Sequence, residues 1–232
     1  MQPLALVTGS NRGIGRALVQ SLEWHGWCVA GHGKSPPYQA CLPRSGLYIQ
    51  ADLQFPEEAA NKFVNWMEQH GVPTLLVHNA GYYKADSYGQ GEVWARCMAV
   101  NYLSPRLITE RWMALSDPSE IRYLVHILSI AALKPRLDAV SYSFSKLCLK
   151  LYSEELRNHW SARRFRLINV YPGPVLTDSW GGEESLPEGM LKPEDVARCV
   201  IDALNSPTPE NQERYNTPMK PTAVLEEIII TG

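Results

Sequence analysis

The sequence has no apolar run of the roughly 18 to 20 residues that a membrane-spanning helix requires. Its opening residues, MQPLALVTGS, contain no basic segment of the kind that begins a secretory signal. Positive charge is not in excess, because 22 Lys and Arg stand against 24 Asp and Glu, a net charge of −2. This balance argues against a nucleic-acid binder and against a polybasic protein of the membrane surface.

Paired cysteines are also missing. The five cysteines are odd in number and widely spaced, with no C-x-x-C motif. We therefore expect neither a disulfide framework nor a metal site. Reduced thiols are the rule in the cytoplasm, which is the location that the sequence predicts.

No Pro-, Gly- or Ser-rich linker divides the chain, so we expect residues 1–232 to form a single domain. Short β-like runs alternate with amphipathic segments. The predicted strands are 4–8, 27–32, 46–51, 74–78, 123–128, 166–171 and 224–231, and the predicted helices are 13–24, 57–69, 92–115, 140–160 and 193–204. Most strands are continuously apolar, as in a parallel sheet buried on both faces. The order predicts an α/β, Rossmann-like, doubly wound parallel sheet with helices on both faces.

A glycine-rich turn lies between the first predicted strand and the first predicted helix. It consists of Thr8, Gly9, Ser10, Asn11, Arg12, Gly13, Ile14 and Gly15. Glycines allow the backbone to turn tightly and to approach a pyrophosphate at a helix N-terminus. A plain turn is the alternative, but the strand before it and the helix after it favour a dinucleotide site.

The end of the second predicted strand lacks the acid that binds the ribose 2′-hydroxyl in NAD sites. No Asp or Glu occurs from Trp24 to Ala51, and Gly33 stands where the acid is expected, followed by Lys34 and Ser35. Lys34 and Arg12 supply two cations instead. The sequence therefore favours NADP(H) over NAD(H), the alternative being that both cations are solvated surface charges.

Asp52 and Leu53 follow the third predicted strand. A carboxylate at this edge of the sheet can accept a hydrogen bond from the adenine amino group. Capping of a helix or turn is an equally open interpretation of Asp52.

Tyr142 and Lys146 are spaced i, i+4 and share one face of a predicted helix. A nearby ammonium favours the phenolate form of a tyrosine, which could then exchange a proton with an alcohol or carbonyl. Ser129 ends a strand and could stabilise charge on a carbonyl oxygen. Asn101 is an unfavourable residue within the predicted helix 92–115, which marks a functional or kinked position, or else an exposed asparagine.

Together these motifs resemble the short-chain dehydrogenase/reductase family over nearly the whole chain. The matching segments are TGSNRGIG (8–15), Asp52-Leu53, HNAG (78–81), Asn101, Ser129, YSFSK (142–146) and PGPVLT (172–177). The resemblance implies a catalytic set of Asn101, Ser129, Tyr142 and Lys146. Tyr142 would be the acid/base, Ser129 would polarise the carbonyl, Lys146 would bind the nicotinamide ribose and depress the tyrosine pKa, and Asn101 would hold a relay water.

The resemblance also implies cofactor contacts outside the glycine turn. Asn79, Ala80 and Gly81 would steady the sheet beside the adenosine, and Pro172, Gly173, Val175 and Thr177 would close over the nicotinamide. His78 replaces an asparagine common in the family, and we interpret it as structural. A homodimer or homotetramer is the expected assembly, acting on a small carbonyl or alcohol substrate.

Three functions remain open on the sequence. The leading one is an NADPH-dependent carbonyl reductase, reversible as an alcohol dehydrogenase. The others are an NAD-linked alcohol dehydrogenase and a dinucleotide-binding regulator with vestigial catalysis. A short loop after Thr177 suggests an open substrate pocket. Its lining, or else ordinary packing or an oligomer contact, is expected from Tyr82, Tyr83, Leu133, Leu137 and Trp180.

Overall fold

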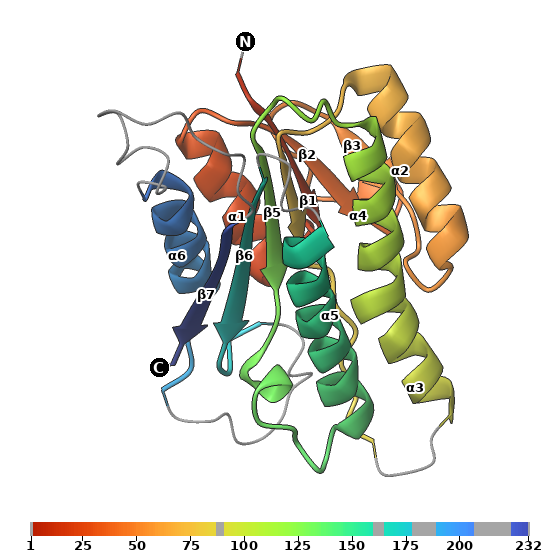
Figure 1. The fold of residues 1–232 in the computed structure, drawn as a ribbon, viewed down its shortest axis with the longest axis vertical. Helices are drawn as coiled ribbons and strands as arrows, with labels where there is room; N and C mark the ends of the chain where they lie inside the picture. Colours follow the sequence, from red (N-terminus) through yellow and green to blue (C-terminus); the bar gives the residue numbers. More distant parts are fainter. Residues whose placement is uncertain (1, 87–90, 160–164, 178–188, 207–223, 232) are drawn as a thin grey trace.

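Seven parallel strands form one sheet in the computed structural model, which describes residues 2–86, 91–159, 165–177, 189–206 and 224–231 (Figure 1). The strands are β1 (Leu4–Thr8), β2 (Cys28–Gly33), β3 (Tyr48–Gln50), β4 (Leu75–His78), β5 (Arg122–Ile127), β6 (Phe165–Pro172) and β7 (Val224–Ile230). Their order across the sheet is β3-β2-β1-β4-β5-β6-β7. The predicted doubly wound parallel sheet is confirmed, and the predicted strand limits differ by no more than two residues at either end.

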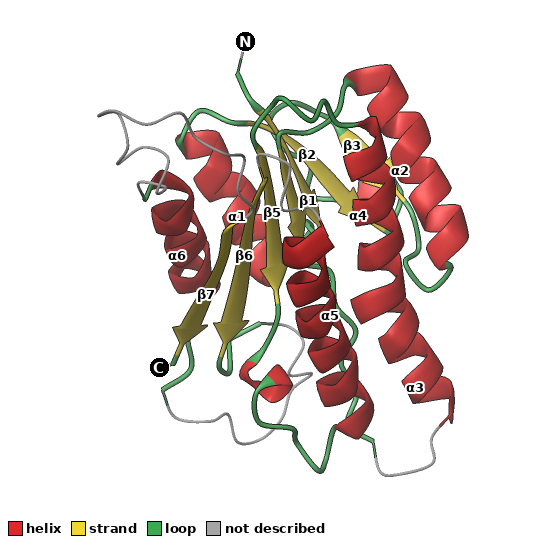
Figure 2. Ribbon diagram, viewed as in Figure 1, coloured by secondary structure: helices red, strands yellow, loops and turns green. Residues whose placement is uncertain are grey.

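Two helical layers cover the sheet, as Figure 2 shows in red against yellow. The helices are α1 (Gly13–Trp24), α2 (Pro56–His70), α3 (Gly91–Met98), α4 (Ser104–Leu115), α5 (Val140–His159) and α6 (Pro193–Asn205). Leu18 of α1 and Val196 of α6 belong to one buried cluster, whereas Phe63 of α2, Ile108 of α4 and Leu149 of α5 belong to the other. Helices therefore cover both faces, as the sequence predicts.

The helix limits follow from local chemistry. Pro56 and Pro193 occupy the first turns of α2 and α6, where the missing N–H of proline is no loss. The Lys192 backbone N–H donates to Asp195 at 2.9 Å, which closes the start of α6. Gly71 ends α2 at φ +98°.

The predicted helix 92–115 is interrupted. Residues Ala99–Leu103 form a π-helical turn (η2) between α3 and α4, with Asn101 at its centre. A π turn holds an extra residue and is frequent at functional sites. The asparagine that conflicts with helix propensity thus lies where the helix departs from regular α geometry, and its side chain is buried, not exposed.

The connection between β2 and β3 contains no α-helix. Residues 34–47, all of which are described, form a loop with one 3₁₀ turn, η1 (Pro37–Gln39). A second 3₁₀ turn, η3 (Ile130–Ala132), follows β5 and was not predicted. The carboxyl ends of β6 and β7, η3 and the first turn of α5 lie in the lower part of Figure 1.

Candidate active site

The glycine turn is shaped by close backbone contacts. Gly9 has φ +65°, and a Cβ there would lie 2.8 Å from Ala80 Cα. A Cβ on Gly15 would lie 2.1 Å from the Gly9 carbonyl oxygen. Real Cβ atoms do not approach this closely, so these two positions require glycine. The turn is therefore a cradle of bare backbone.

The start of α1 leaves its amide groups available to an anion. Arg12 precedes the first helical residue, Gly13, and its side chain makes no capping hydrogen bond. The first turn contains no acidic residue. Unpaired N–H groups and the helix dipole favour a bound anion at such a terminus. The residues present thus fit a dinucleotide pyrophosphate.

The predicted residues Asn79 and Ala80 hold the cradle against the sheet. The Asn79 side-chain amide donates to the carbonyl oxygens of Thr8 and Gly9 at 2.9 and 3.1 Å. The backbone N–H groups of Asn79 and Ala80 both donate to Thr8 Oγ1, at 2.9 and 3.0 Å. The bonding role of Thr8 was not anticipated, although Thr8 stands in the motif.

The buried ring of His32 supports the same turn. His32 Nδ1 accepts the Gly9 N–H at 3.2 Å, and its Nε2 lies 3.1 Å from the Ala51 carbonyl oxygen. Burial lowers the pKa of His32 to about 4. The neutral ring therefore donates from Nε2 and accepts at Nδ1, which fixes the Gly9 amide. No sequence signal distinguished His32 from other strand residues.

The predicted adenosine end of the site is open to solvent. Lys34 and Arg12 are exposed, and Ser35 is half-buried. Asp52 Oδ1 accepts the Gln54 N–H at 2.9 Å, so the carboxylate caps a turn, one of its two interpretations. The carbonyl oxygen of buried Leu53 accepts a hydrogen bond from Ser104 at 2.7 Å, which places Leu53 in the packing under α4.

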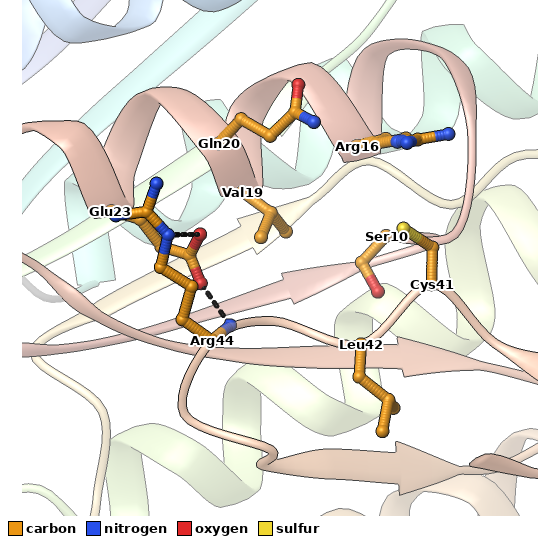
Figure 3. Close-up of a pocket in the computed structure, with 8 residues that line it drawn as sticks. All are labelled: Ser10, Arg16, Val19, Gln20, Glu23, Cys41, Leu42 and Arg44. Atoms are coloured by element: carbon orange, nitrogen blue, oxygen red, sulfur yellow. Dashed lines mark hydrogen bonds and ion pairs between the residues drawn. The ribbon is translucent and has the colours of Figure 1, made fainter. Parts of the chain in front are cut away.

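The helix-free β2–β3 loop leaves a pocket of about 250 Å³ against α1 (Figure 3). Its lining residues are Ser10, Arg16, Val19, Gln20, Glu23, Cys41, Leu42 and Arg44. The Arg44 backbone N–H donates to Glu23 at 2.5 Å and so fastens the loop to the helix. Only Ser10 of the predicted cofactor residues lines this pocket.

The predicted catalytic residues meet beside the glycine turn, and none of them lines this pocket. Tyr142 lies in the first turn of α5 and is half-buried, and the side chain of Ser129 lies near enough to lower the pKa of its phenol. The Tyr83 ring packs edge-on at 5.2 Å between ring centroids. Burial raises the pKa of Tyr142, and the Ser129 side chain opposes that rise.

Lys146 lies one helical turn further along α5 and is buried. Its Nζ donates to the Ile127 carbonyl oxygen at 2.7 Å and lies 5.9 Å from the centroid of the Tyr142 ring. Burial lowers the pKa of Lys146 to about 8. The net pKa of Tyr142 is raised because desolvation of the phenol outweighs the other effects, and its lowering by Lys146 stays a prediction.

Asn101 brings the π turn to the same place. Its Oδ1 accepts the Tyr82 N–H at 2.7 Å, and its Nδ2 donates to the Tyr82 carbonyl oxygen and to Ser145 Oγ, both at 2.9 Å. A Cβ placed on Gly81 would lie 3.6 Å from Asn101 Oδ1 and 3.8 Å from Lys146 Nζ. The side chain of Asn101 is therefore fully engaged and lies near Lys146.

The segment after β6 returns toward the glycine turn. The Gly173 N–H donates to Ile230 at 2.8 Å, Pro172 ends β6, and Val175 pairs with Leu191 in an isolated bridge. The methyl carbon of Thr177 would lie 3.1 Å from a Cβ on Gly13. Thr177 thus lies beside the glycine turn, and its place over the nicotinamide stays a prediction.

The expected substrate-lining residues differ in position. Tyr82 and Tyr83 lie beside Asn101 and Tyr142, whereas Leu133 is exposed and Leu137 is 91% exposed. Trp180 and the short loop after Thr177 fall outside the described residues.

One buried acid at this edge was not anticipated. Asp86 accepts hydrogen bonds from the N–H and hydroxyl of Ser141, and so caps α5 one residue before Tyr142.

Comparison with known proteins identifies the family. A sequence model described as short chain dehydrogenase matches residues 3–185. The chain belongs to the short-chain dehydrogenase family. It is 28% identical over 200 residues to the short chain dehydrogenase pigC of Monascus ruber, covering 78% of this chain and 65% of that protein. It spans 55–65% of the length of three curated relatives that it matches.

Two other matches cover almost the whole chain. Sepiapterin reductase of Chlorobaculum tepidum is 25% identical over 250 residues, 99% of this chain and 96% of that protein. The structure of an alcohol dehydrogenase from Thermococcus sibiricus, complexed with 5-hydroxy-NADP, superimposes with a TM-score of 0.78 at 18% identity, covering 100% and 97% of the two chains. This structural likeness shows the shared fold.

Two further observations concern membrane spanning and metal binding. Among the residues that the structure describes, no helix is both long and apolar enough to cross a membrane. The same residues contain no group of three or more His, Cys, Asp or Glu side chains arranged to hold a metal ion.

Proposed function

We propose that the protein is an NADP(H)-dependent oxidoreductase that transfers hydride between the nicotinamide and a carbonyl or secondary alcohol substrate. The supporting observation is the convergence of Tyr142, Ser129, Lys146 and Asn101 beside a glycine cradle. The cofactor supplies the hydride chemistry when bound, and the protein supplies position and proton transfer.

Tyr142 is the proposed acid/base. The raised pKa keeps its phenol protonated at neutral pH, so in the reductive direction it can donate its proton to the carbonyl oxygen. Ser129, which lies beside the same hydroxyl, can donate to that oxygen as negative charge develops. Carbonyl reduction therefore starts from the protonation state that the free protein favours.

Lys146 and Asn101 are proposed to position and resupply that proton. Lys146 lies within reach of the tyrosine ring and is held by the Ile127 carbonyl oxygen, which leaves two of its ammonium protons for a ribose hydroxyl and a water. The π turn at Asn101 disturbs regular helical backbone bonding, which can free a carbonyl group for such a water.

The proposed cofactor site runs from the glycine turn to Thr177. Arg12 and Lys34 supply cations for a ribose 2′-phosphate, and the carboxylate typical of an NAD site is absent from the end of β2. The Thermococcus sibiricus enzyme, complexed with 5-hydroxy-NADP, supports this preference. An NAD-linked alcohol dehydrogenase remains the second candidate. A single domain, a homodimer or homotetramer and a cytoplasmic location stay predictions.

The test is Tyr142→Phe, assayed beside the wild type with NADPH over a diverse panel of carbonyl compounds. We expect turnover on any accepted substrate to fall about 10²- to 10⁴-fold, because a general acid is lost. NADPH binding, followed by nicotinamide fluorescence, should stay within about twofold, because the phenol is not part of the glycine cradle.

Turnover retained by Tyr142→Phe would remove Tyr142 from its role. Tight NADPH binding by the wild type, with no oxidation of NADPH by any compound of the panel, would favour a dinucleotide-binding regulator. Equal affinity of the wild type for NADPH and NADH would refute the NADP(H) preference and leave the chemistry of Tyr142 standing.

A further inference from the structure

A tyrosine on β3 joins two loops of the proposed cofactor site. Asn11 Nδ2, in the glycine turn, donates to Tyr48 Oη at 3.0 Å, and Tyr48 Oη donates to the Ser35 carbonyl oxygen at 3.1 Å. The hydroxyl can play both parts only while it is protonated. Partial burial raises the pKa of Tyr48, which keeps the proton in place. The result is a bridge from the glycine turn to the residue after Lys34.

The same hydroxyl fills the space beside Gly33. A Cβ on Gly33 would lie 2.5 Å from Tyr48 Oη and 2.6 Å from Asn11 Nδ2. Any side chain at position 33 would therefore displace both atoms of the hydrogen bond. Position 33 is where an NAD site carries its acid, so the Asn11–Tyr48 pair gives a physical reason for the glycine.

The bridge also fixes the spacing of the two exposed cations, Arg12 and Lys34. Arg12 directly follows Asn11, and Lys34 directly precedes Ser35, so the bridge holds the backbone on either side. The 34–47 loop has no α-helix to hold it rigid, which makes a side-chain tie at its start more important.

We propose that Tyr48 is a specificity-determining, positioning residue for the cofactor. Its hydroxyl holds the loops of Arg12 and Lys34 at the separation that one ribose 2′-phosphate requires, and together with Asn11 it excludes a carboxylate from position 33. The proposal rests on the NADP(H) preference proposed above. Tyr48 does not touch the reacting atoms, so its effect is on binding.

The first experiment measures dissociation constants of NADPH and NADH by fluorescence titration of the full chain. Tyr48→Phe removes one oxygen atom and leaves the ring. We expect NADPH to bind about tenfold more weakly, which corresponds to about 1.4 kcal/mol for the loss of the hydrogen bonds of the hydroxyl. The dissociation constant of NADH should change by less than about twofold. Tyr38→Phe, in the same loop but at a ring that is 84% exposed, is the matched control and should change neither.

The second experiment places Gly33→Asp in the wild type and in the Tyr48→Phe background. In the wild type we expect a lower melting temperature and no gain in NADH affinity, because the new side chain meets two atoms. Without the Tyr48 hydroxyl, the penalty in melting temperature should shrink and NADH affinity should rise. Neither readout depends on turnover.

Two outcomes overturn the proposal, and a third separates it from the proposed function. Equal weakening of NADPH and NADH by Tyr48→Phe would make Tyr48 merely structural. An identical penalty for Gly33→Asp in both backgrounds would overturn the exclusion of the carboxylate. A wild type that binds both nucleotides equally would refute the proposed cofactor preference, while the melting temperatures would still decide whether Tyr48 blocks position 33.

Discussion

The two halves of the carboxyl edge of the sheet treat buried polar groups differently. At the ends of β1 and β2, the side chains of Thr8 and His32 bond to neighbouring backbone groups. At the ends of β4, β5 and β6, His78, His126 and Asn169 stand opposite one another in register. Each of these three carries one buried nitrogen without a hydrogen-bond partner among the described residues.

The two halves therefore serve different purposes: one holds a ligand, and the other sets the pKa values of groups near the proton-transfer site. In the glycine-turn half, the side chains of Thr8, His32 and Asn79 bond to backbone groups, which preorganises a cradle. Asn11 Oδ1 is the exception there, since it has no partner among the described residues. The half under Tyr142 and Lys146 keeps desolvated groups close together, and desolvation moves their pKa values: that of Lys146 falls to about 8 and that of His126 to about 3. Desolvation also lowers the pKa of His32 in the glycine-turn half, to about 4, but both nitrogens of its neutral ring bond to backbone and fix the turn. Near Tyr142, such shifts can serve proton transfer.

The largest expected effect is the loss of folding stability at low pH. His32 and His126 are held neutral in the fold, with pKa values near 4 and 3 against 6.5 in an unfolded chain. The unfolded state therefore binds more protons below pH 6.5, and stability is lost as pH falls toward these values. The two differences correspond to about 3 and about 5 kcal/mol of unfolding free energy when fully lost.

This prediction is measured by urea unfolding at pH 7.5 and pH 5. The wild type should lose about 2 kcal/mol more than His126→Gln across this range, which is the share of one buried histidine. His25→Asn, at an exposed site just after α1, should behave as the wild type. Equal losses in the wild type and His126→Gln would show that His126 is not held neutral.

Gly15→Ala should disturb the glycine turn and leave the half of the sheet edge under Tyr142 unchanged. The new Cβ would lie 2.1 Å from the Gly9 carbonyl oxygen, so backbone must move. We expect a loss of about 3 kcal/mol in urea unfolding and no measurable NADPH binding. Gly91→Ala, at the first residue of α3, is the matched control and should be near neutral, because no other described residue lies within 4 Å of an added Cβ. Retained nucleotide affinity in Gly15→Ala would mean that the turn is not the binding cradle.

Lys146→Met should test the half of the sheet edge under Tyr142. It removes a buried cation but also the hydrogen bond to Ile127, so we expect a net stability gain of about 1–2 kcal/mol at pH 7 and loss of turnover. Between pH 8 and 10.5 the folded lysine is neutral while the unfolded one still binds a proton. Wild-type stability therefore rises over that range, and the gain from Met should shrink. A gain independent of pH would contradict the shifted pKa.

Much of the fold and of the candidate site could be predicted from sequence because the signals are local. Apolar runs mark β1 to β7, and glycine spacing marks the cradle where Gly9 and Gly15 meet other backbone. The i, i+4 pair of Tyr142 and Lys146 lies in one helix, so its proximity needs no knowledge of tertiary structure.

The remainder depends on contacts between distant segments. Tyr48 reads as an ordinary strand residue until Asn11, 37 positions away, is placed beside it. The pKa of Tyr142 depends on how much of the phenol is desolvated, which no sequence spacing states. The π turn at Asn101 was visible only as a conflict with helix propensity, and its geometry required the packing of α3, α4 and α5.

The π turn also makes the length of this helical run a constraint. An α-helix rotates by about 100° per residue. Because the π turn holds one extra residue, deleting one residue from Ala99–Leu103 would let regular α geometry return and leave the buried face of α4, with Trp112, toward the core. The same deletion would move Asn101 away from Tyr82 and Ser145, so the length of this segment is constrained by the position of Asn101 and not by the packing of α4.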